Sequence, residues 1–378
     1  METFFSARCP YCFKMLKTNN VVFEKPAAYN EDLFLKTYYA QNGQNSINSN
    51  FGYIDPAKKG SKDIIRDIDI SRIMSGILDE GGEIHDIKLC PYCHHKLPNT
   101  FATSNTRYIA VVGLPSSGKT AYLSALNASL NKMSYFWTDQ YLEANRPLNE
   151  MTNKYLTDPS ATGIATQNIQ GPYYYGLRTN EANVKDNIIF FDIPGEYYKD
   201  PTKISQQLKK FLLAADGIVF VINAAQSMET QPNEFNDNSV FNDNTKVGRI
   251  FAAFQEAGVN SQKKVAILFN KLDKLFTINA EFEGKYMVET QGEEVDESEI
   301  KVKSDAIKIL LLNNPAVDSS IKQIINRIEV VFGTESRIFA SSLIIENESR
   351  KVFRYNGAET PFLWLLSQTN AFPKKKID

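Results

Sequence analysis

The sequence has few histidines and cysteines and no surplus of basic residues. Its 378 residues include three histidines and four cysteines, and the formal net charge is -2. Proteins that track nucleic acid usually carry a basic surplus, so this balance argues against nucleic acid as the main partner. All three histidines precede residue 96, and no Ser-His-Asp set stands out.

Long apolar runs are also absent. No stretch of about 18 apolar residues occurs, which argues against a membrane-spanning helix. The first ten residues, METFFSARCP, lack the basic and then apolar order of a secretory signal. We therefore expect a cytoplasmic protein.

Short apolar runs are frequent, and they alternate with helical patterns. Residues 217–222 (GIVFVI) and 264–269 (KVAILF) are continuously apolar, as in strands buried on both faces of a parallel sheet. We expect further strands at 107–112, 173–177, 187–191 and 337–340, and helices at 119–130, 204–214, 245–257, 360–369 and twice between 299 and 332. This alternation predicts an α/β fold with a doubly wound, mostly parallel sheet and helices on both faces.

A glycine-rich loop follows the first of these strands. Residues 113–120, GLPSSGKT, match the pattern GxxxxGK[ST], in which backbone N–H groups point at phosphates. Lys119 can reach the β- and γ-phosphates, and the Thr120 hydroxyl can join the shell of a Mg²⁺ ion. The expected nucleotide contacts in this segment are Gly113, Ser116, Ser117, Gly118, Lys119, Thr120 and Ala121.

The segment DIPG follows another predicted strand directly. Asp192 stands where a carboxylate can hold Mg²⁺, commonly through water, and Gly195 can bring its N–H close to the γ-phosphate. Asp, Pro and Gly also favour plain turns, so the segment alone leaves both interpretations open. Its place after a phosphate-binding loop favours the functional one.

The segment NKLD follows the run at 264–269. Asp273 can accept two hydrogen bonds from guanine, and adenine offers no matching pair of donors. A site built on such bonds rejects the wrong base strongly, because the carboxylate would be left unpaired. Asn270 can tie this loop to the phosphate loop, and the stem of Lys271 can lie on the base. A capped helix start is the alternative interpretation.

The ordered set GLPSSGKT, DIPG and NKLD resembles the translation-factor and Ras-like (TRAFAC) P-loop GTPases over roughly residues 107–370. The resemblance implies binding of GTP and GDP with Mg²⁺ and action as a molecular switch on a protein effector or GTPase partner. It implies a backbone N–H to guanine O6 from Ala340, Ser341 or Ser342. It also implies a switch threonine on Mg²⁺, for which Thr162 and Thr166 are candidates; Thr166 lies nearer the following strand.

The sequence departs from these relatives after DIPG. Many of them place Gln there to orient the attacking water, whereas this chain has Glu196. An ionised glutamate cannot donate a hydrogen bond and repels a triphosphate, so we expect slow intrinsic hydrolysis or help from a partner. The expected catalytic set is Lys119, Thr120, Thr166, Asp192, Gly195 and Glu196. A nucleotide-holding scaffold and a nucleic-acid-associated GTPase are the alternative functions.

The four cysteines form two identical tetrads, Cys-Pro-Tyr-Cys. Cys9, Cys12, Cys90 and Cys93 can supply the four thiolates of a tetrahedral zinc site. The pattern resembles a zinc ribbon with a large insertion between its two turns. Two dithiol redox sites and buried free cysteines are the alternatives. The arrangement of a zinc module followed by such a domain resembles that of bacterial GTPases associated with conflict systems.

These patterns divide the chain into two domains. Residues 1–100 form the zinc-ribbon-like module, residues 105–372 form the Ras-like domain, and 99–106 form a linker. Within the insertion, the apolar spacing at 63–79 predicts a helix. We expect His85, His94 and His95 to lie beside the metal ligands or at the surface, because four thiolates already saturate zinc.

Overall fold

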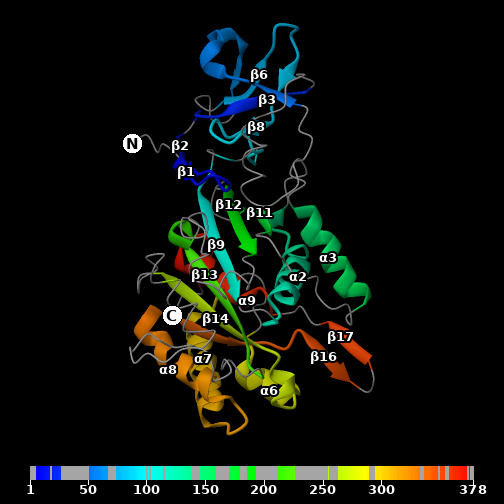
Figure 1. Cartoon of the computed structure of the whole chain (residues 1–378), viewed down its shortest axis with the longest axis vertical. Coiled ribbons are helices and arrows are strands. Elements are labelled where there is room, and N and C mark those ends of the chain that lie inside the picture. Colours follow the sequence, from blue (N-terminus) through cyan, green and yellow to red (C-terminus); the bar gives the residue numbers. More distant parts are fainter. Residues whose placement is uncertain are drawn as a thin grey trace, which may run out of the picture. The chain divides into compact units, whose positions relative to one another are not determined.

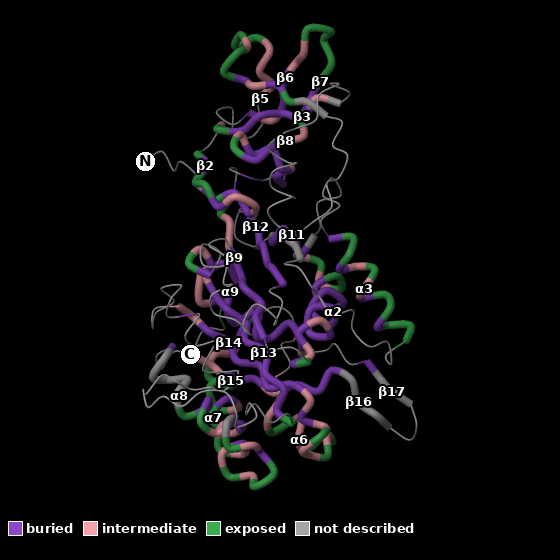
Figure 2. The backbone as a smooth tube through the Cα atoms, viewed as in Figure 1, coloured by how far each residue is buried: buried purple, intermediate pink, exposed green. Residues whose placement is uncertain are grey.

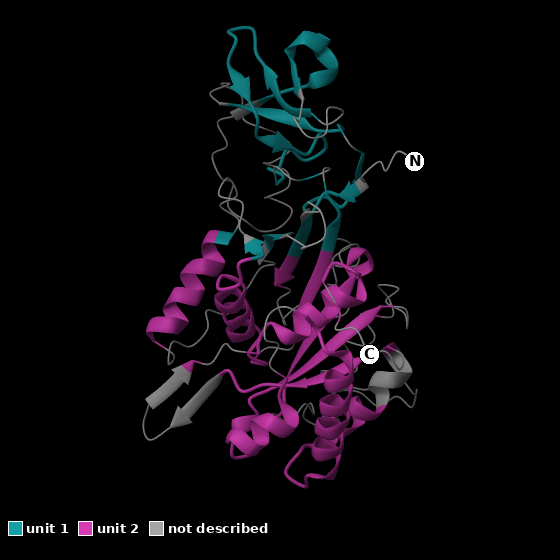
Figure 3. Ribbon diagram, turned by 180° about the vertical axis from the view of Figure 1, so that it is seen from behind, with its two compact units in different colours: residues 1–107, 135–145, 172–189 teal, residues 108–134, 146–171, 190–378 magenta. Residues whose placement is uncertain are grey.

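A computed structural model of the chain describes the residues from 6 to 374 with gaps. The described ranges are 6–17, 19–26, 51–66, 74–98, 101, 104–113, 116–137, 145–158, 170–178, 185–192, 212–225, 254, 263–288, 294–332, 336–347, 350–353, 357–372 and 374. The chain forms two compact units (Figure 3). Unit 1 contains residues 1–107, 135–145 and 172–189, and unit 2 contains residues 108–134, 146–171 and 190–378.

The N-terminal part of unit 1 consists of short strands. They are β1 (Ser6–Arg8), β2 (Met15–Lys17), β3 (Val22–Pro26), β4 (Phe51–Ile54), β5 (Ile64–Arg66), β6 (Met74–Leu78), β7 (Ile84–His85) and β8 (Lys88–Leu89), with 3-10 turns at Pro56–Lys58 and Ser61–Asp63. β1 and β2 form a hairpin, and two small sheets have the orders β4-β3-β8 and β5-β6-β7.

The rest of the chain alternates longer strands with helices (Figure 1). The strands are β9 (Thr106–Gly113), β10 (Phe136–Trp137), β11 (Gln170–Arg178), β12 (Lys185–Asp192), β13 (Gly217–Asn223), β14 (Lys264–Asn270), β15 (Arg337–Ala340), β16 (Ile344–Asn347) and β17 (Arg350–Phe353). The helices are α2 (Lys119–Leu130), α3 (Arg146–Thr157), α6 (Ala280–Tyr286), α7 (Glu297–Asn313), α8 (Ser319–Phe332) and α9 (Thr360–Gln368), with a 3-10 turn at Leu272–Lys274.

One large sheet carries the strands that precede the sequence motifs. Its order is β10-β11-β12-β9-β13-β14-β15. β13 pairs in parallel with β9 and with β14, and β14 pairs in parallel with β15. The register places Val221 opposite Gly113 and Asn223 opposite Asn270. The carboxyl ends of β9, β13 and β14 therefore meet at one edge of the sheet.

The strands β9, β13, β14 and β15 of this sheet form the core of unit 2. Every residue of β13 is buried, and so are nearly all residues of β14, as Figure 2 shows for the central strands. α9 packs on β13 and β14, and α7 packs on β15. This confirms the predicted α/β class with a mostly parallel sheet, because strands covered on both faces read as continuous apolar runs. Among the described helices, none combines the length and apolarity needed to cross a membrane.

The predicted helix at 63–79 is wrong. Within its described residues the chain forms β5 and β6, which pair antiparallel with each other. The apolar spacing comes largely from isoleucines, whose branched Cβ favours strands. Gly76 lies inside β6, with His85 O only 3.1 Å from where a Cβ would stand, and glycine also disfavours a helix.

The other predicted elements agree with the structure where it describes them. The helix predicted at 119–130 has the bounds of α2. Of the helices expected at 204–214 and 245–257, only residues 212–214 and 254 are described, all in helical conformation. The predicted linker at 99–106 contains the fully buried Phe101 and the start of β9. The patterns missed α3, α6 and the β16–β17 hairpin.

α3 packs against α2 through buried polar side chains. The Asn127 amide is fully buried and donates to Asn149 Oδ1 at 3.0 Å and to Thr152 Oγ1 at 2.8 Å. Thr152 Oγ1 in turn donates to Leu148 O at 2.8 Å. Buried amides need such partners, because an unpaired one costs free energy. The pairing therefore fixes how α3 lies on the helix that begins in the phosphate loop.

We expect Asn127→Ala to lower the free energy of unfolding by about 1–3 kcal/mol, because Asn149 and Thr152 lose a buried partner. Urea unfolding measures the change. Asn153→Ala is the matched control, since Asn153 is exposed on α3 and alanine favours helix. Equal midpoints for the two variants would contradict a role for the amide.

Candidate nucleotide site and cysteine cluster

The phosphate loop has the backbone that its glycines allow. β9 ends at Gly113, and α2 begins at Lys119. Ser116 and Gly118 both have left-handed backbone, with φ of 63° and 87°. Leu114 and Pro115 lie outside the described residues. The strand, loop and helix follow one another as the pattern GxxxxGK[ST] predicts.

Both glycines of the motif are needed for space. A Cβ on Gly118 would lie 2.2 Å from Asn270 Nδ2, and a Cβ on Gly113 would lie 2.7 Å from Ser117 Oγ and from Val221 O. Neither glycine can be replaced without moving the backbone or the asparagine. The glycines therefore let the base-reading loop and the neighbouring strand approach the phosphate loop closely.

Lys119 and Asp192 form a buried ion pair. Lys119 Nζ lies 2.9 Å from Asp192 Oδ1, and their side chains are 7% and 0% exposed. A buried charge without an opposite charge is strongly unfavourable. The structure thus brings together the predicted phosphate lysine and the predicted Mg²⁺ carboxylate, from the start of α2 and the end of β12.

Three side chains from two strand ends hold the phosphate loop. Asn270 Nδ2 donates to Ser117 O at 3.4 Å, and Lys271 Nζ donates to Ser116 O at 2.9 Å. Asn223 Nδ2 also donates to Ser116 O, at 3.4 Å. The sequence predicted this tie for Asn270 alone. Asn223 was missed, although a polar residue ending the apolar run GIVFVI was a signal for it.

The base-reading loop is held in place by serines that follow β15. The Ser342 hydroxyl donates to Asp273 Oδ1 in a short hydrogen bond, and the Asp273 N–H donates to Ser342 Oγ at 3.3 Å. Ser341 Oγ donates to Asn270 Oδ1 at 3.3 Å. The carboxylate predicted to read guanine is therefore oriented by Ser342, a side-chain role that the sequence did not indicate.

Part of the segment that was expected to bind guanine O6 makes a backbone hydrogen bond within the sheet. The Ser341 N–H donates to Phe269 O at 2.8 Å, next to the paired residues Phe269 and Ala340. That N–H is therefore not available for a ligand. Within the predicted segment, Ala340 and Ser342 remain the candidate donors.

Burial changes the titration of Lys271. Desolvation lowers the pKa of its ammonium group, and the nearby Asp273 carboxylate opposes this shift. The residue also has left-handed backbone, with φ of 63°. Its conformation turns the chain sharply after β14, so that the ammonium group reaches back to the phosphate loop.

An orphaned hydroxyl in the loop fits a phosphate ligand. Ser117 Oγ is buried and has no hydrogen-bond partner among the described residues. It stands beside Lys119 at the start of α2, where the helix dipole favours an anion. Thr120 follows in the first turn with a partly exposed side chain, and Ala121 is buried behind it. These groups suit a phosphate and its Mg²⁺ ion.

Four of the predicted site residues cannot be placed. Thr162, Thr166, Gly195 and Glu196 lie outside the described residues. The other residues predicted for the nucleotide site follow the carboxyl ends of β9, β12, β14 and β15. An ion pair and hydrogen bonds link them there. Their contacts with a nucleotide remain predictions.

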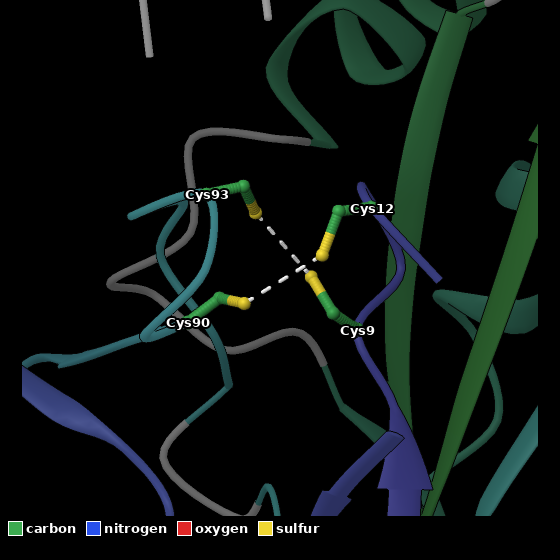
Figure 4. A group of neighbouring side chains, drawn as sticks. All are labelled: Cys9, Cys12, Cys90 and Cys93. Atoms are coloured by element: carbon green, nitrogen blue, oxygen red, sulfur yellow. Dashed lines mark hydrogen bonds between the residues drawn. The ribbon is translucent and has the colours of Figure 1, made fainter. Parts of the chain in front are cut away.

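The four cysteines of unit 1 converge on one point (Figure 4). Cys9 Sγ lies 3.6 Å from Cys93 Sγ, Cys12 Sγ lies 3.8 Å from Cys90 Sγ, and the four sulfurs all lie within 4.8 Å of one another. All four are free of disulfides. Zn–S bonds of about 2.3 Å in a tetrahedron place sulfurs about 3.8 Å apart, so the cluster has the dimensions of a zinc site.

The two Cys-Pro-Tyr-Cys turns have matching hydrogen bonds. The N–H groups of Tyr11 and Tyr92 each donate to the first sulfur of their turn at 3.4 Å. Phe13 and His94, which follow the second cysteines, have left-handed backbone with φ of 59° and 56°. Such N–H donation stabilises thiolates. The repeated geometry therefore favours one four-thiolate metal site over two separate dithiols.

The neighbouring histidines lie beside the cluster and are buried. His95 stacks on Tyr11 with ring centroids 3.9 Å apart, and its Nδ1 lies 3.1 Å from Cys93 O. His94 packs against Tyr53. Both are under 5% exposed, so they form the packing around the four sulfurs and are not at the surface.

A family model described as Double-GTPase 2 matches residues 107–308, which is more than half of the chain. No curated protein matches the sequence. The match covers the phosphate loop, DIPG and NKLD, and it ends within α7. It leaves the cysteine cluster and the serines after β15 outside.

The solved structures that match the chain include two with bound GDP. The GTPase-like domain of S. cerevisiae Ski7, bound to GDP and inorganic phosphate, is 15% identical with a TM-score of 0.34, covering 73% of this chain and 51% of that one. Sup35 complexed with GDP is 13% identical with a TM-score of 0.24, covering 63% and 37%. The chain thus spans about half or less of the length of these structures.

We expect Ser342→Ala to weaken binding of guanine nucleotides about tenfold or more, because a hydrogen bond to a charged group contributes about 1.5–3 kcal/mol. Titration with fluorescent GDP measures the dissociation constant. Ser319→Ala, at an exposed position that starts α8, is the control. Unchanged affinity in Ser342→Ala would show that Asp273 is held without this hydroxyl.

Proposed function

This chain belongs to the Double-GTPase 2 family, and we propose that it binds GTP and GDP with Mg²⁺, hydrolyses GTP, and acts as a molecular switch. One observation supports the proposal most: Asn270 and Lys271, beside the residue expected to read guanine, bond directly to the carbonyls of Ser117 and Ser116. Base and phosphate recognition would therefore share one rigid site.

The phosphate end of the site has a distinct role for each group. Lys119 would contact the β- and γ-phosphates, with backbone N–H groups of the loop and the N-terminus of α2 on the same anion. The Thr120 hydroxyl and Asp192 would hold Mg²⁺. When bound, Mg²⁺ would offset negative charge on the phosphates. The 2.9 Å contact of Lys119 with Asp192 keeps these two groups close enough to serve one ligand.

The base end would select guanine. Asp273 accepts hydrogen bonds from the guanine edge, and Ser342 holds the carboxylate in its orientation. The Asp273 side chain is 11% exposed. A base without matching donors would therefore leave a desolvated carboxylate unpaired. This supports guanine as the bound base.

Turnover is expected to be slow. Glu196 replaces the glutamine that orients water in many relatives of this type, and it carries a charge of the same sign as the phosphates. The segments around Thr166 and Gly195 would respond to the γ-phosphate, and a protein partner would read their state. A nucleotide-holding scaffold with little hydrolysis is the second candidate, and Glu196 is the residue that favours it.

The N-terminal module would bind one structural Zn²⁺ ion through Cys9, Cys12, Cys90 and Cys93. Burial raises the pKa of the Cys9 thiol, and zinc would hold the sulfurs as thiolates. The sulfur separations and the matching turns support this ion. It would join two chain segments that are far apart in sequence.

We expect Asp273→Asn to lose preference for GTP and gain binding of xanthosine triphosphate. An asparagine amide donates where the carboxylate accepted, and xanthine offers a carbonyl in place of the guanine amino group. Competition between the two nucleotides for the purified chain measures the switch, which should exceed about tenfold. Asp318→Asn, in the loop before α8, is the control.

Binding of ATP in preference to GTP by the wild type would contradict the proposed base site. So would an Asp273→Asn variant that keeps the wild-type order of affinities.

The rate of GTP hydrolysis distinguishes a GTPase from a nucleotide-holding scaffold. We expect slow, Mg²⁺-dependent release of phosphate from GTP by the wild type and none by Lys119→Ala, because the variant loses its phosphate cation. A malachite green assay measures the rate, and far-UV circular dichroism checks that the variant folds. Wild-type release at the level of buffer, with nucleotide still bound, would favour the scaffold.

A further inference from the structure

A tight turn in unit 1 holds one carboxylate oxygen of Asp79 through backbone hydrogen bonds. The turn joins β6 and β7. Asp79 Oδ1 accepts hydrogen bonds from the N–H groups of Gly81 and Glu83, both at 2.9 Å. The second oxygen, Oδ2, is left to face β7 and β3, from which His85 and Lys25 approach it.

A buried imidazole lies beside that oxygen. His85 Nε2 is 3.3 Å from Asp79 Oδ2, and the His85 side chain is 4% exposed. Nε2 nevertheless has no hydrogen-bond partner among the described residues. The ring nitrogen is therefore close to the carboxylate without being aimed along a hydrogen bond to it. Two ligands about 2.1 Å from one tetrahedral ion lie about 3.4 Å apart, which is close to this separation.

A second carboxylate completes the group. One carboxylate oxygen of Glu83, one of Asp79 and one ring nitrogen of His85 all lie within 4.8 Å of one another. We propose that Asp79, Glu83 and His85 form a binding site for a divalent transition-metal ion of the Zn²⁺ class, separate from the four cysteines. One imidazole and two carboxylates suit such ions, and water fills the remaining positions.

Lys25 is the cation that such an ion must displace. Its Nζ lies 3.5 Å from Asp79 Oδ2, and its side chain is 44% exposed. A long exposed side chain can move into solvent at little cost. The lysine and the metal ion compete for one carboxylate oxygen, so removing the lysine strengthens metal binding. An ordinary turn with a surface ion pair predicts no such gain.

The test is the zinc content of the full chain. The wild type and variants are dialysed against buffered Zn²⁺ at increasing free concentration, and bound zinc per chain is measured by elemental analysis. We expect Glu83→Gln to bind one equivalent fewer than the wild type. Glu80→Gln is the matched control, because Glu80 lies in the same turn with its side chain 94% exposed, and it should keep the wild-type number.

The test compares the zinc bound per chain between the wild type and each variant, so zinc held by the cysteine cluster cancels. His85→Gln should lose the same equivalent, and Lys25→Met should bind it about fivefold or more tightly. With Co²⁺, the equivalent lost in Glu83→Gln should lack the intense absorption of thiolate ligands. Equal zinc content in the wild type and Glu83→Gln overturns the proposal, as does unchanged affinity in Lys25→Met.

Discussion

The parallel register of β9, β13 and β14 is the constraint on which the nucleotide site depends. It places Gly113 opposite Val221 and Asn223 opposite Asn270, so that the three strands end at one edge. From that edge, short side chains can reach the phosphate loop. A shift by one residue would turn each side chain to the other face. In open α/β sheets, ligands bind at the carboxyl ends of the strands, where the loops that follow the strands come together.

The elements that could be predicted are those with a local physical cause. α2 begins where a glycine with left-handed backbone ends the phosphate loop, and buried strands of a parallel sheet read as unbroken apolar runs. The segment 63–79 failed because periodicity alone does not separate short strands from a helix. There the partners decide: β5 and β7 pair with β6, and Gly76 allows the close approach of β7.

The contacts that organise the site could not be predicted in the same way. The motifs place Lys119, Asp192 and Asp273 at strand ends, which is a local property. Ser342 reaches Asp273 from 69 residues away, and Asn223 reaches Ser116 from 107 residues away. Such contacts depend on which strands are neighbours and on their register, which no local pattern contains.

The two units rest on different sources of stability. Unit 2 has a sheet whose central strands are covered on both faces, so apolar burial can hold it together. The N-terminal part of unit 1 has described strands of two to five residues, and its core cluster includes Cys9, Cys90 and Cys93 themselves. A core of that size rarely suffices without a metal or disulfide. The spacing of the four free cysteines therefore supports the proposed metal site, which would stabilise this small core.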